Sequence, residues 1–140
     1  MSNFREKVTV QTTVHAPIEK VWGIWTNANH ITKWYNASED WHAPYTENDL
    51  KVGANFKTTM AAKDGSMSFD FIGTYTKVEL NSTIDYSIVD GRKVEIRFSV
   101  DGNTTTVVET FEAEDENLIE VQRGGWQAIL GSFKNYTEAN

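Results

Sequence analysis

The strongest constraint on the fold is an amphipathic helix expected near the C-terminus, after a long run of β-type sequence. Its large apolar residues recur at the i, i+3, i+4, i+7 spacing of one helical face, namely Trp126, Ile129, Leu130 and Phe133. Asn117, with Glu120 three residues later, has the spacing of an N-cap pair, so the helix is predicted to begin near Asn117. A sheet that grips this helix either packs flush against it or leaves an apolar cavity, and the sequence leaves both open.

Glycines at two places carry expectations about backbone packing. Gly124 and Gly125 lie inside the predicted helix, where each costs about 1 kcal/mol relative to alanine, so we expect a bend or a close approach to a neighbouring backbone. Gly73 lies in the middle of the predicted strand 69–75, where glycine is a poor strand former. Gly73 is therefore expected to permit sheet curvature or a close approach of the C-terminal helix.

From Gly53 to about Ala113 the chain is predicted to form a β meander. Apolar residues alternate with polar ones, which is typical of an antiparallel sheet with one buried face and one solvated face. The residues expected on the buried face are Phe56, Thr58, Met60, Met67, Phe69, Phe71, Ile84, Tyr86, Ile88, Val94, Ile96, Phe98 and Val100. Asp-Gly pairs at 64–65, 90–91 and 101–102 predict tight hairpins in which both turn residues adopt positive φ.

The N-terminal part is predicted to contain one strand and two short helices. The strand covers roughly 4–14, a first helix runs over 18–25 after Pro17, and a second runs over 29–34. An irregular, aromatic-rich stretch is expected over 35–53. The predicted fold class is α+β, with a curved antiparallel sheet of about six or seven strands wrapped around a long C-terminal helix.

Composition limits the classes of protein and partner. With 140 residues, 39% of them hydrophobic, the chain is expected to form a single domain over 1–140. Its charged N-terminus lacks the apolar stretch of a signal peptide, so we expect a cytoplasmic protein without stable membrane anchoring. The net charge of −7 disfavours nucleic acids as partners, and the absence of cysteine excludes disulfides and thiolate chemistry. A monomer or weak dimer is expected.

No strong catalytic, nucleotide-binding or metal-binding motif is present. His15, His30 and His42 are scattered, without the spacing that places ligands on one face, so no metal site is predicted. Neither a GxSxG elbow nor a GxGxxG or P-loop motif occurs. No catalytic residue and no cofactor are therefore predicted.

Glu109 is the one titratable residue in an unusual place. If Val107 and Phe111 face inward, strict alternation also buries Glu109, and burial would raise its pKa. A β-bulge that returns Glu109 to solvent is the interpretation that we favour, because bulges re-aim side chains in curved sheets.

The aromatic residues are either ordinary core or the walls of a cavity. Buried aromatic clusters are usually core, but Trp and Tyr combine bulk with a polar group, as pockets for apolar ligands require. The residues predicted to bind a ligand are Trp34, Trp41, Phe56, Met60, Phe71, Tyr86, Glu109, Trp126, Leu130 and Phe133.

Several segments resemble the bacterial branch of the activator-of-heat-shock-ATPase-like family of the START-like, helix-grip (SRPBCC) superfamily. They are 16–22, Trp34, 71–75, 108–111 and above all 122–133. The resemblance covers nearly the whole chain and implies the helix-grip fold. It also implies a deep cavity between the C-terminal helix and the sheet, commonly used for lipids, sterols, polyketides or other apolar ligands. No particular ligand is implied, since one fold hosts many functions.

Three functions are compatible with these observations. Binding of a small apolar or amphipathic ligand, of lipid, sterol, polyketide or flavonoid type, is favoured because no catalytic constellation is recognisable. The family name suggests a co-chaperone whose partner is a heat-shock ATPase, although the eukaryotic activators carry an additional N-terminal domain for which this chain has no room. The third is a cyclase- or hydrolase-type enzyme using Glu109, Tyr86 or His30, which lacks a recognisable acid–base pair.

Overall fold

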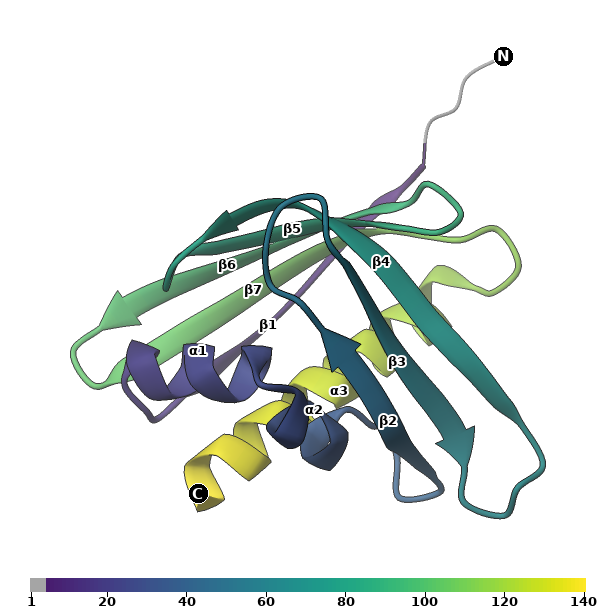
Figure 1. Cartoon of the computed structure of the whole chain (residues 1–140), viewed down its shortest axis with the longest axis horizontal. Coiled ribbons are helices and arrows are strands. Elements are labelled where there is room, and N and C mark those ends of the chain that lie inside the picture. The colour runs from purple at the N-terminus through teal and green to yellow at the C-terminus, as the bar shows by residue number, and fades with distance from the viewer. Residues whose placement is uncertain (1–4) are drawn as a thin grey trace.

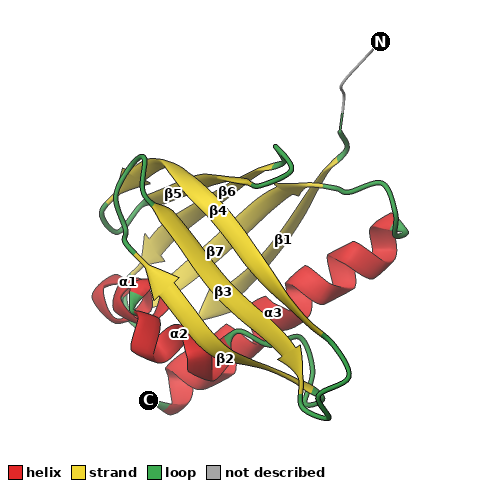
Figure 2. Ribbon diagram, turned by 45° about the vertical axis from the view of Figure 1, so that its right-hand side comes forward, coloured by secondary structure: helices red, strands yellow, loops and turns green. Residues whose placement is uncertain are grey.

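The computed structural model describes residues 5–140, which form one curled, seven-stranded sheet and three α-helices (Figures 1 and 2). The elements in chain order are β1 (Lys7–Val14), α1 (Ile18–Thr26), α2 (Ala28–Trp34), β2 (Trp41–Asn48), β3 (Asn55–Ala62), β4 (Ser68–Glu79), β5 (Thr83–Ile88), β6 (Lys93–Asp101), β7 (Thr104–Glu112) and α3 (Ile119–Ala139). The strands lie in the order β1-β7-β6-β5-β4-β3-β2, and every neighbouring pair is antiparallel. The predicted α+β architecture is confirmed. Phe4, included in the predicted first strand, lies outside the described residues.

Residues 41–48 were expected to be irregular but form the edge strand β2. Its register against β3 is interrupted between His42 and Tyr45, and Pro44 lies inside this interruption. Proline is tolerated in sheets at edges and bulges, where its missing N–H breaks no ladder bond. The prediction of an irregular stretch is wrong because the interruption hides the period-two pattern.

The start of α3 differs from the predicted N-cap pair. The helix begins at Ile119, and Leu118 occupies the cap position without a side-chain bond. Gln122 holds the preceding turn instead: its Nε2 donates to the carbonyls of Asn117 at 2.9 Å and Glu114 at 3.1 Å, and its Oε1 accepts from the Glu114 N–H at 2.9 Å. Asn117 is therefore not the N-cap, because the buried Gln122 side chain hydrogen-bonds to the backbone of the loop before α3 instead.

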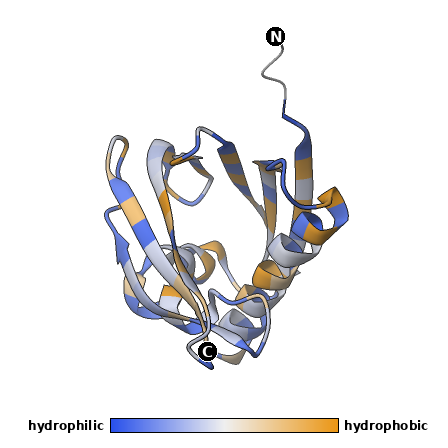
Figure 3. Cartoon of the chain, turned by 90° about the vertical axis from the view of Figure 1, so that its right-hand side faces the viewer, coloured by the Kyte–Doolittle hydropathy of each residue, from blue (hydrophilic) through white to orange (hydrophobic). Residues whose placement is uncertain are grey.

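The core lies between the concave face of the sheet and the helices. Every second residue is buried along β5 and β7, and along β6 as far as Phe98, and Figure 3 shows hydrophobic and hydrophilic positions alternating along the strands. Three residues expected on this face are exposed, namely Met67 (63%), Phe69 (49%) and Val100 (55%). All three lie at or next to the ends of hairpins, so the alternation assigned their face without showing how far the helices cover it.

In the Asp-Gly turns only the glycines have positive φ, so the aspartates do not adopt the predicted conformation.

α3 lies along the free edge of β1, and its side chains hydrogen-bond to the carbonyl groups of that edge. Its polar residues donate to every second β1 carbonyl: Arg123 Nη1 to Thr9 at 3.3 Å, Gln127 Nε2 to Gln11 at 3.0 Å and Lys134 Nζ to Thr13 at 2.6 Å. Unpaired strand edges are templates for aggregation, and these bonds cover this one. They also fix α3 at the β1 side of the sheet. No helix within residues 5–140 combines the length and apolar character needed to cross a membrane.

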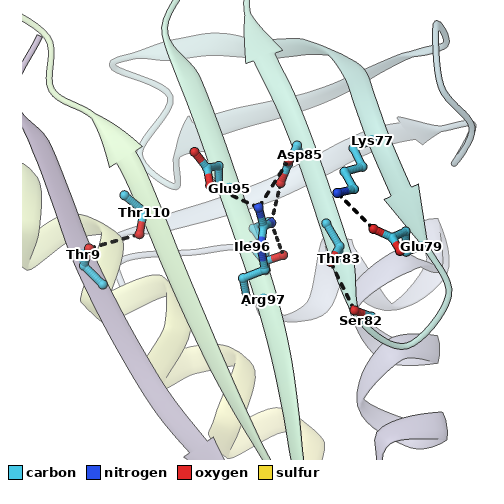
Figure 4. A network of polar contacts seen from close by, with 10 residues as sticks. All are labelled: Thr9, Lys77, Glu79, Ser82, Thr83, Asp85, Glu95, Ile96, Arg97 and Thr110. Carbon is cyan, nitrogen blue, oxygen red and sulfur yellow. Dashed lines mark hydrogen bonds and ion pairs between the residues drawn. The ribbon is translucent and has the colours of Figure 1, made fainter.

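The outer face of the sheet carries polar pairs (Figure 4). Arg97 on β6 forms ion pairs with Asp85 at 2.5 Å and with Glu95 at 3.1 Å, and the hydroxyls of Thr9 and Thr110 lie 3.0 Å apart. Exposed ion pairs of this kind each contribute about 1 kcal/mol or less to stability. The outer face is therefore a solvated surface.

Gly73 on β4 makes room for an aromatic ring rather than for the C-terminal helix. A Cβ atom there would lie 2.5 Å from Cε2 and Cζ of Phe56 and 3.1 Å from the Ser87 carbonyl oxygen. We expect Gly73→Val to lower the free energy of unfolding by about 1–3 kcal/mol in urea denaturation, because overpacking outweighs the higher strand propensity. Gly124→Ala is the control, since a Cβ at Gly124 or Gly125 has nothing within 4 Å and the expected close approach there does not occur. A Gly73→Val protein as stable as the wild type would contradict this account.

Candidate functional site

An inner cavity lies between the concave face of the sheet and the three helices. Its walls are mostly aromatic and aliphatic, with a few hydroxyl, amide and carboxyl groups. The lining residues are Trp25, Ile31, Trp34, Tyr35, Thr46, Asn48, Phe56, Thr58, Tyr75, Ile84, Tyr86, Ile96, Glu109, Trp126 and Ile129. The centre of a water-sized sphere can occupy about 50 Å³ of it. One water needs about 10–15 Å³ on this measure, so the cavity holds a few waters or one small chemical group.

An outer groove adjoins the inner cavity between α3 and the strands β3 and β4. It offers about 340 Å³ on the same measure, and Met60, Phe71 and Val121 are among its lining residues. Tyr35, Trp126 and Ile129 line both spaces and so form the wall between them. Movement of these three side chains would join the cavity to the groove.

Trp126 is held in this wall by aromatic contacts from two strands. Its indole stacks on Phe111 of β7, with ring centroids 4.1 Å apart and an interplanar angle of 8°, and meets Phe71 of β4 edge-on at 6.2 Å. Phe111 is fully buried, whereas Trp126 is half-buried. The indole is thus anchored on one face while part of it stays accessible.

Glu109 on β7 points into the inner cavity and is only 5% exposed. It pairs with Val10 of β1 on one side and with Ile96 of β6 on the other, in registers without interruption. The favoured bulge is therefore wrong, because ladders on both sides of β7 leave no place for an extra residue. Burial raises the pKa of the Glu109 carboxyl from 4.5 to about 8.

Three tyrosines share the cavity with Glu109, and Tyr35 and Tyr86 are the two without a hydrogen-bond partner in the described residues. Tyr35 follows α2 and Tyr86 lies on β5. Burial, with a smaller electrostatic effect of Glu109, raises the pKa of both phenols above the ordinary value. Neither phenol and neither oxygen of Glu109 hydrogen-bonds to another residue in the described part of the chain. These three side chains are the hydroxyl and carboxyl groups of the cavity that lack a hydrogen-bond partner within residues 5–140.

The polar groups on the β2 side of the cavity are paired with one another. The Tyr75 hydroxyl donates to Asn48 Oδ1, and Asn48 Nδ2 donates to the Thr26 carbonyl at 2.6 Å. The hydroxyls of Thr46 and Thr58 lie 2.7 Å apart. The hydroxyl and carboxyl groups without a hydrogen-bond partner therefore lie on the Glu109 side of the cavity.

The ten predicted site residues fall into four groups in the structure. Those that line the inner cavity are Trp34, Phe56, Tyr86, Glu109 and Trp126. Met60 and Phe71 line the outer groove, while Trp41 packs against Phe69 near the β3–β4 hairpin, with ring centroids 5.9 Å apart. Leu130 and Phe133 are fully buried core residues that line neither space.

Several lining residues were not predicted from the sequence. Tyr35 and Asn48 fall in the stretch predicted to be irregular, so nothing indicated which way they face. Trp25 and Ile129 belong to apolar helical stripes, a signal that could have identified them. In contrast, the Trp34 Nε1 donates to the Ile24 carbonyl at 3.1 Å, so this predicted polar handle is already used.

The histidines lie outside the inner cavity. His30 Nδ1 is 2.8 Å from the Tyr136 hydroxyl, and the His15 N–H donates to Glu138 at 2.8 Å. Among the residues that the structure describes, no three His, Asp or Glu side chains gather as they would around a metal ion.

Comparison with known proteins identifies relatives over nearly the whole chain. A family model described as "Activator of Hsp90 ATPase homolog 1-like protein" matches residues 15–138. The solution structure of an AHSA1-like protein from Aeromonas hydrophila is 42% identical, with a TM-score of 0.90 over 96% of this chain and 93% of that one. A protein of solved structure from Cytophaga hutchinsonii is 58% identical, with a TM-score of 0.82 over 96% and 93%. No curated protein matches the chain. The helix-grip fold expected from the sequence is thus confirmed.

Proposed function

Because this chain belongs to the Activator of Hsp90 ATPase homolog 1-like family, of START-like fold, we propose that it binds a small apolar or amphipathic molecule. Lipid, sterol, polyketide and flavonoid types are the candidate classes. The observation that carries the proposal is the aromatic-walled inner cavity with three unpartnered polar side chains, next to an apolar groove. Apolar walls with a few convergent polar groups are typical of small-molecule sites.

The two spaces suggest how such a ligand would lie. The inner cavity, at about 50 Å³, is too small for a whole sterol or flavonoid, but the outer groove adds about 340 Å³. A ligand would place one polar end beside Glu109 and its apolar body along the groove, displacing Tyr35, Trp126 or Ile129. This arrangement favours amphipathic molecules over uniformly apolar ones.

A co-chaperone role is the second candidate, because the family description names activation of the Hsp90 ATPase. Phe69 and Val121, which line the outer groove, are 49% and 60% exposed. Such apolar side chains would also suit a protein partner.

An enzyme of cyclase or hydrolase type would depend on Glu109 and Tyr86 alone, since His30 lies outside the cavity. A cytoplasmic monomer or weak dimer without stable membrane anchoring is compatible with all three functions.

Replacing Trp126 with alanine tests the ligand-binding proposal. We expect a member of a panel of flavonoids, sterols, fatty acids and polyketides to change tryptophan emission and raise the melting temperature. At a hundredfold excess over Kd, binding to the native state alone adds about 2.7 kcal/mol of stability. Trp126→Ala should weaken that binding by about tenfold or more, a loss of about 1.4 kcal/mol.

Leu130→Ala is the matched control, because Leu130 is on the same helix, fully buried and outside both spaces. It should lower the free energy of unfolding by about 2–5 kcal/mol while the folded protein keeps its affinity. Equal losses of affinity in the two variants, or no thermal shift with any compound, would contradict the proposed site.

A further inference from the structure

We propose that the inner cavity selects an uncharged ligand by one acceptor oxygen, such as a ketone or amide carbonyl, which Glu109, Tyr35 and Tyr86 bind as hydrogen-bond donors. This inference rests on the proposed function and narrows its ligand class. It concerns the polar end of the ligand and leaves the apolar body to the outer groove.

The first support is that three oxygen-bearing side chains converge without partners. Glu109 comes from β7, Tyr86 from β5 and Tyr35 from the end of α2, and all three line the same cavity. Glu109 and Tyr86 are 5% and 6% exposed. Buried polar groups are nearly always hydrogen-bonded, and leaving one unpaired is costly. The one side-chain oxygen of the described residues that is fully enclosed without a partner is Thr137 Oγ1, so the oxygens of Glu109, Tyr35 and Tyr86 border accessible space where water or a ligand atom can bind them.

The second support is the charge of the surroundings. The titratable groups that face Glu109 are Tyr35 after α2, Tyr75 on β4 and Tyr86 on β5, while α1 and α3 contribute tryptophan and isoleucine. No lysine, arginine or histidine lines the cavity. Arg92 lies in the wall of the outer groove. Arg92 is paired with Asp90 at 2.7 Å and acts on Tyr86, where it lowers the phenol pKa against the larger effect of burial. Because no cation lines the inner cavity itself and burial raises the pKa of Glu109 to about 8, the carboxyl is mainly protonated at neutral pH and can donate a hydrogen bond.

Hydrogen-bond donors in a cavity without a lining cation distinguish ligands by the charge of their polar group. A carbonyl oxygen accepts from all three hydroxyl groups and remains uncharged. A ligand carboxylate would be buried without a cation, which is strongly unfavourable. An ammonium group would require Glu109 to ionise in the interior, where the cost of desolvating both charges offsets their attraction. The cavity should therefore prefer carbonyl compounds over fatty-acid anions and over amines.

Four small probes of similar size test this preference: acetophenone, ethylbenzene, benzoate and benzylamine. Affinities are measured by titration of 1H–13C methyl spectra, which report Ile84, Ile96 and Ile129 of the cavity wall. At about pH 6.5, acetophenone should bind about tenfold or more tightly than ethylbenzene, and benzoate more weakly than either. At about pH 9, where Glu109 is ionised but Tyr35 and Tyr86 keep their protons, the preference for acetophenone should fall by about fivefold or more.

Two variants separate the donor from the charge. Glu109→Gln keeps a donor and cannot ionise, so it should retain the preference for acetophenone at both pH values. Glu109→Leu removes one of the three donors and leaves Tyr35 and Tyr86, so it should lower the preference for acetophenone over ethylbenzene by about fivefold. The spectra of each free variant establish that it is folded.

The outcomes distinguish this inference from the proposed function. If neither these probes nor the larger panel of compounds binds, the proposed function fails. If ethylbenzene or benzoate binds as tightly as acetophenone, the donor assignment is overturned while ligand binding stands. Benzylamine binding that strengthens at the higher pH would also overturn it, because Glu109 would then act as an anion.

Discussion

A chain ending at Gly125 is expected to lose cooperative folding. The truncation removes Leu130 and Phe133, both fully buried, together with the partly buried Trp126 and Ile129. Burial of side chains of this size is worth about 1.5–3 kcal/mol each, against a total stability of about 5–15 kcal/mol. The loss of Gln127 and Lys134 would also uncover part of the β1 edge. Circular dichroism during heating should show no cooperative transition.

The control is a chain that ends at Glu138. It lacks only two exposed residues and keeps the ion pair of Lys134 with Glu138 at 2.8 Å. Its melting temperature should match that of the full chain. If the chain ending at Gly125 melted cooperatively near the same temperature, α3 would not be the element that completes the core.

Glu109→Gln is expected to stabilise the protein strongly at alkaline pH. Burial raises the pKa of Glu109 from 4.5 to about 8, so the folded state keeps a proton that the unfolded state releases between these values. The stability linked to this proton is complete below about pH 4.5 and is lost as the pH rises to about 8. The full difference is about 5 kcal/mol at most, since each pKa unit is worth about 1.4 kcal/mol and relaxation of the site reduces it. Glutamine has nearly the same shape and does not ionise.

Urea denaturation at several pH values measures this effect. The wild-type free energy of unfolding should fall between about pH 5 and pH 8, while that of Glu109→Gln falls much less, so the two diverge as the pH rises. Glu116→Gln is the control, because Glu116 is exposed in the connection before α3 and its replacement should change stability little. Parallel curves for wild type and Glu109→Gln would show that Glu109 is not held in an apolar environment.

Local patterns were sufficient to predict most of the framework. The spacing of Trp126, Ile129, Leu130 and Phe133 identified α3, because one helical face must be buried whatever covers it. The alternation along β5 and β6 likewise assigned their inner faces. The same reasoning failed for β2, where the interruption around Pro44 breaks the period on which it depends.

The site depended on information that a single segment does not carry. Whether Glu109 faces inward was decided by the two strands that pair with β7, of which β6 directly precedes it and β1 is distant in sequence. Tyr35 reaches the cavity only because α2 packs where it does. Leu130 and Phe133 were predicted to bind a ligand, but the apolar pattern is identical for a core residue and a cavity wall. In the structure Phe133 packs between Trp25 and Trp34, with ring-centroid distances of 4.8 Å to each.

Native mass spectrometry of the protein purified from its own source tests the central claim most directly. The account predicts a mass above that of the polypeptide, which reverts to the polypeptide mass on denaturation and releases one small, uncharged molecule that contains a carbonyl group. The Trp126→Ala protein, purified in the same way, should carry much less of it. A bare polypeptide mass, in a protein whose melting temperature no compound of the panel raises, would contradict ligand binding in this cavity.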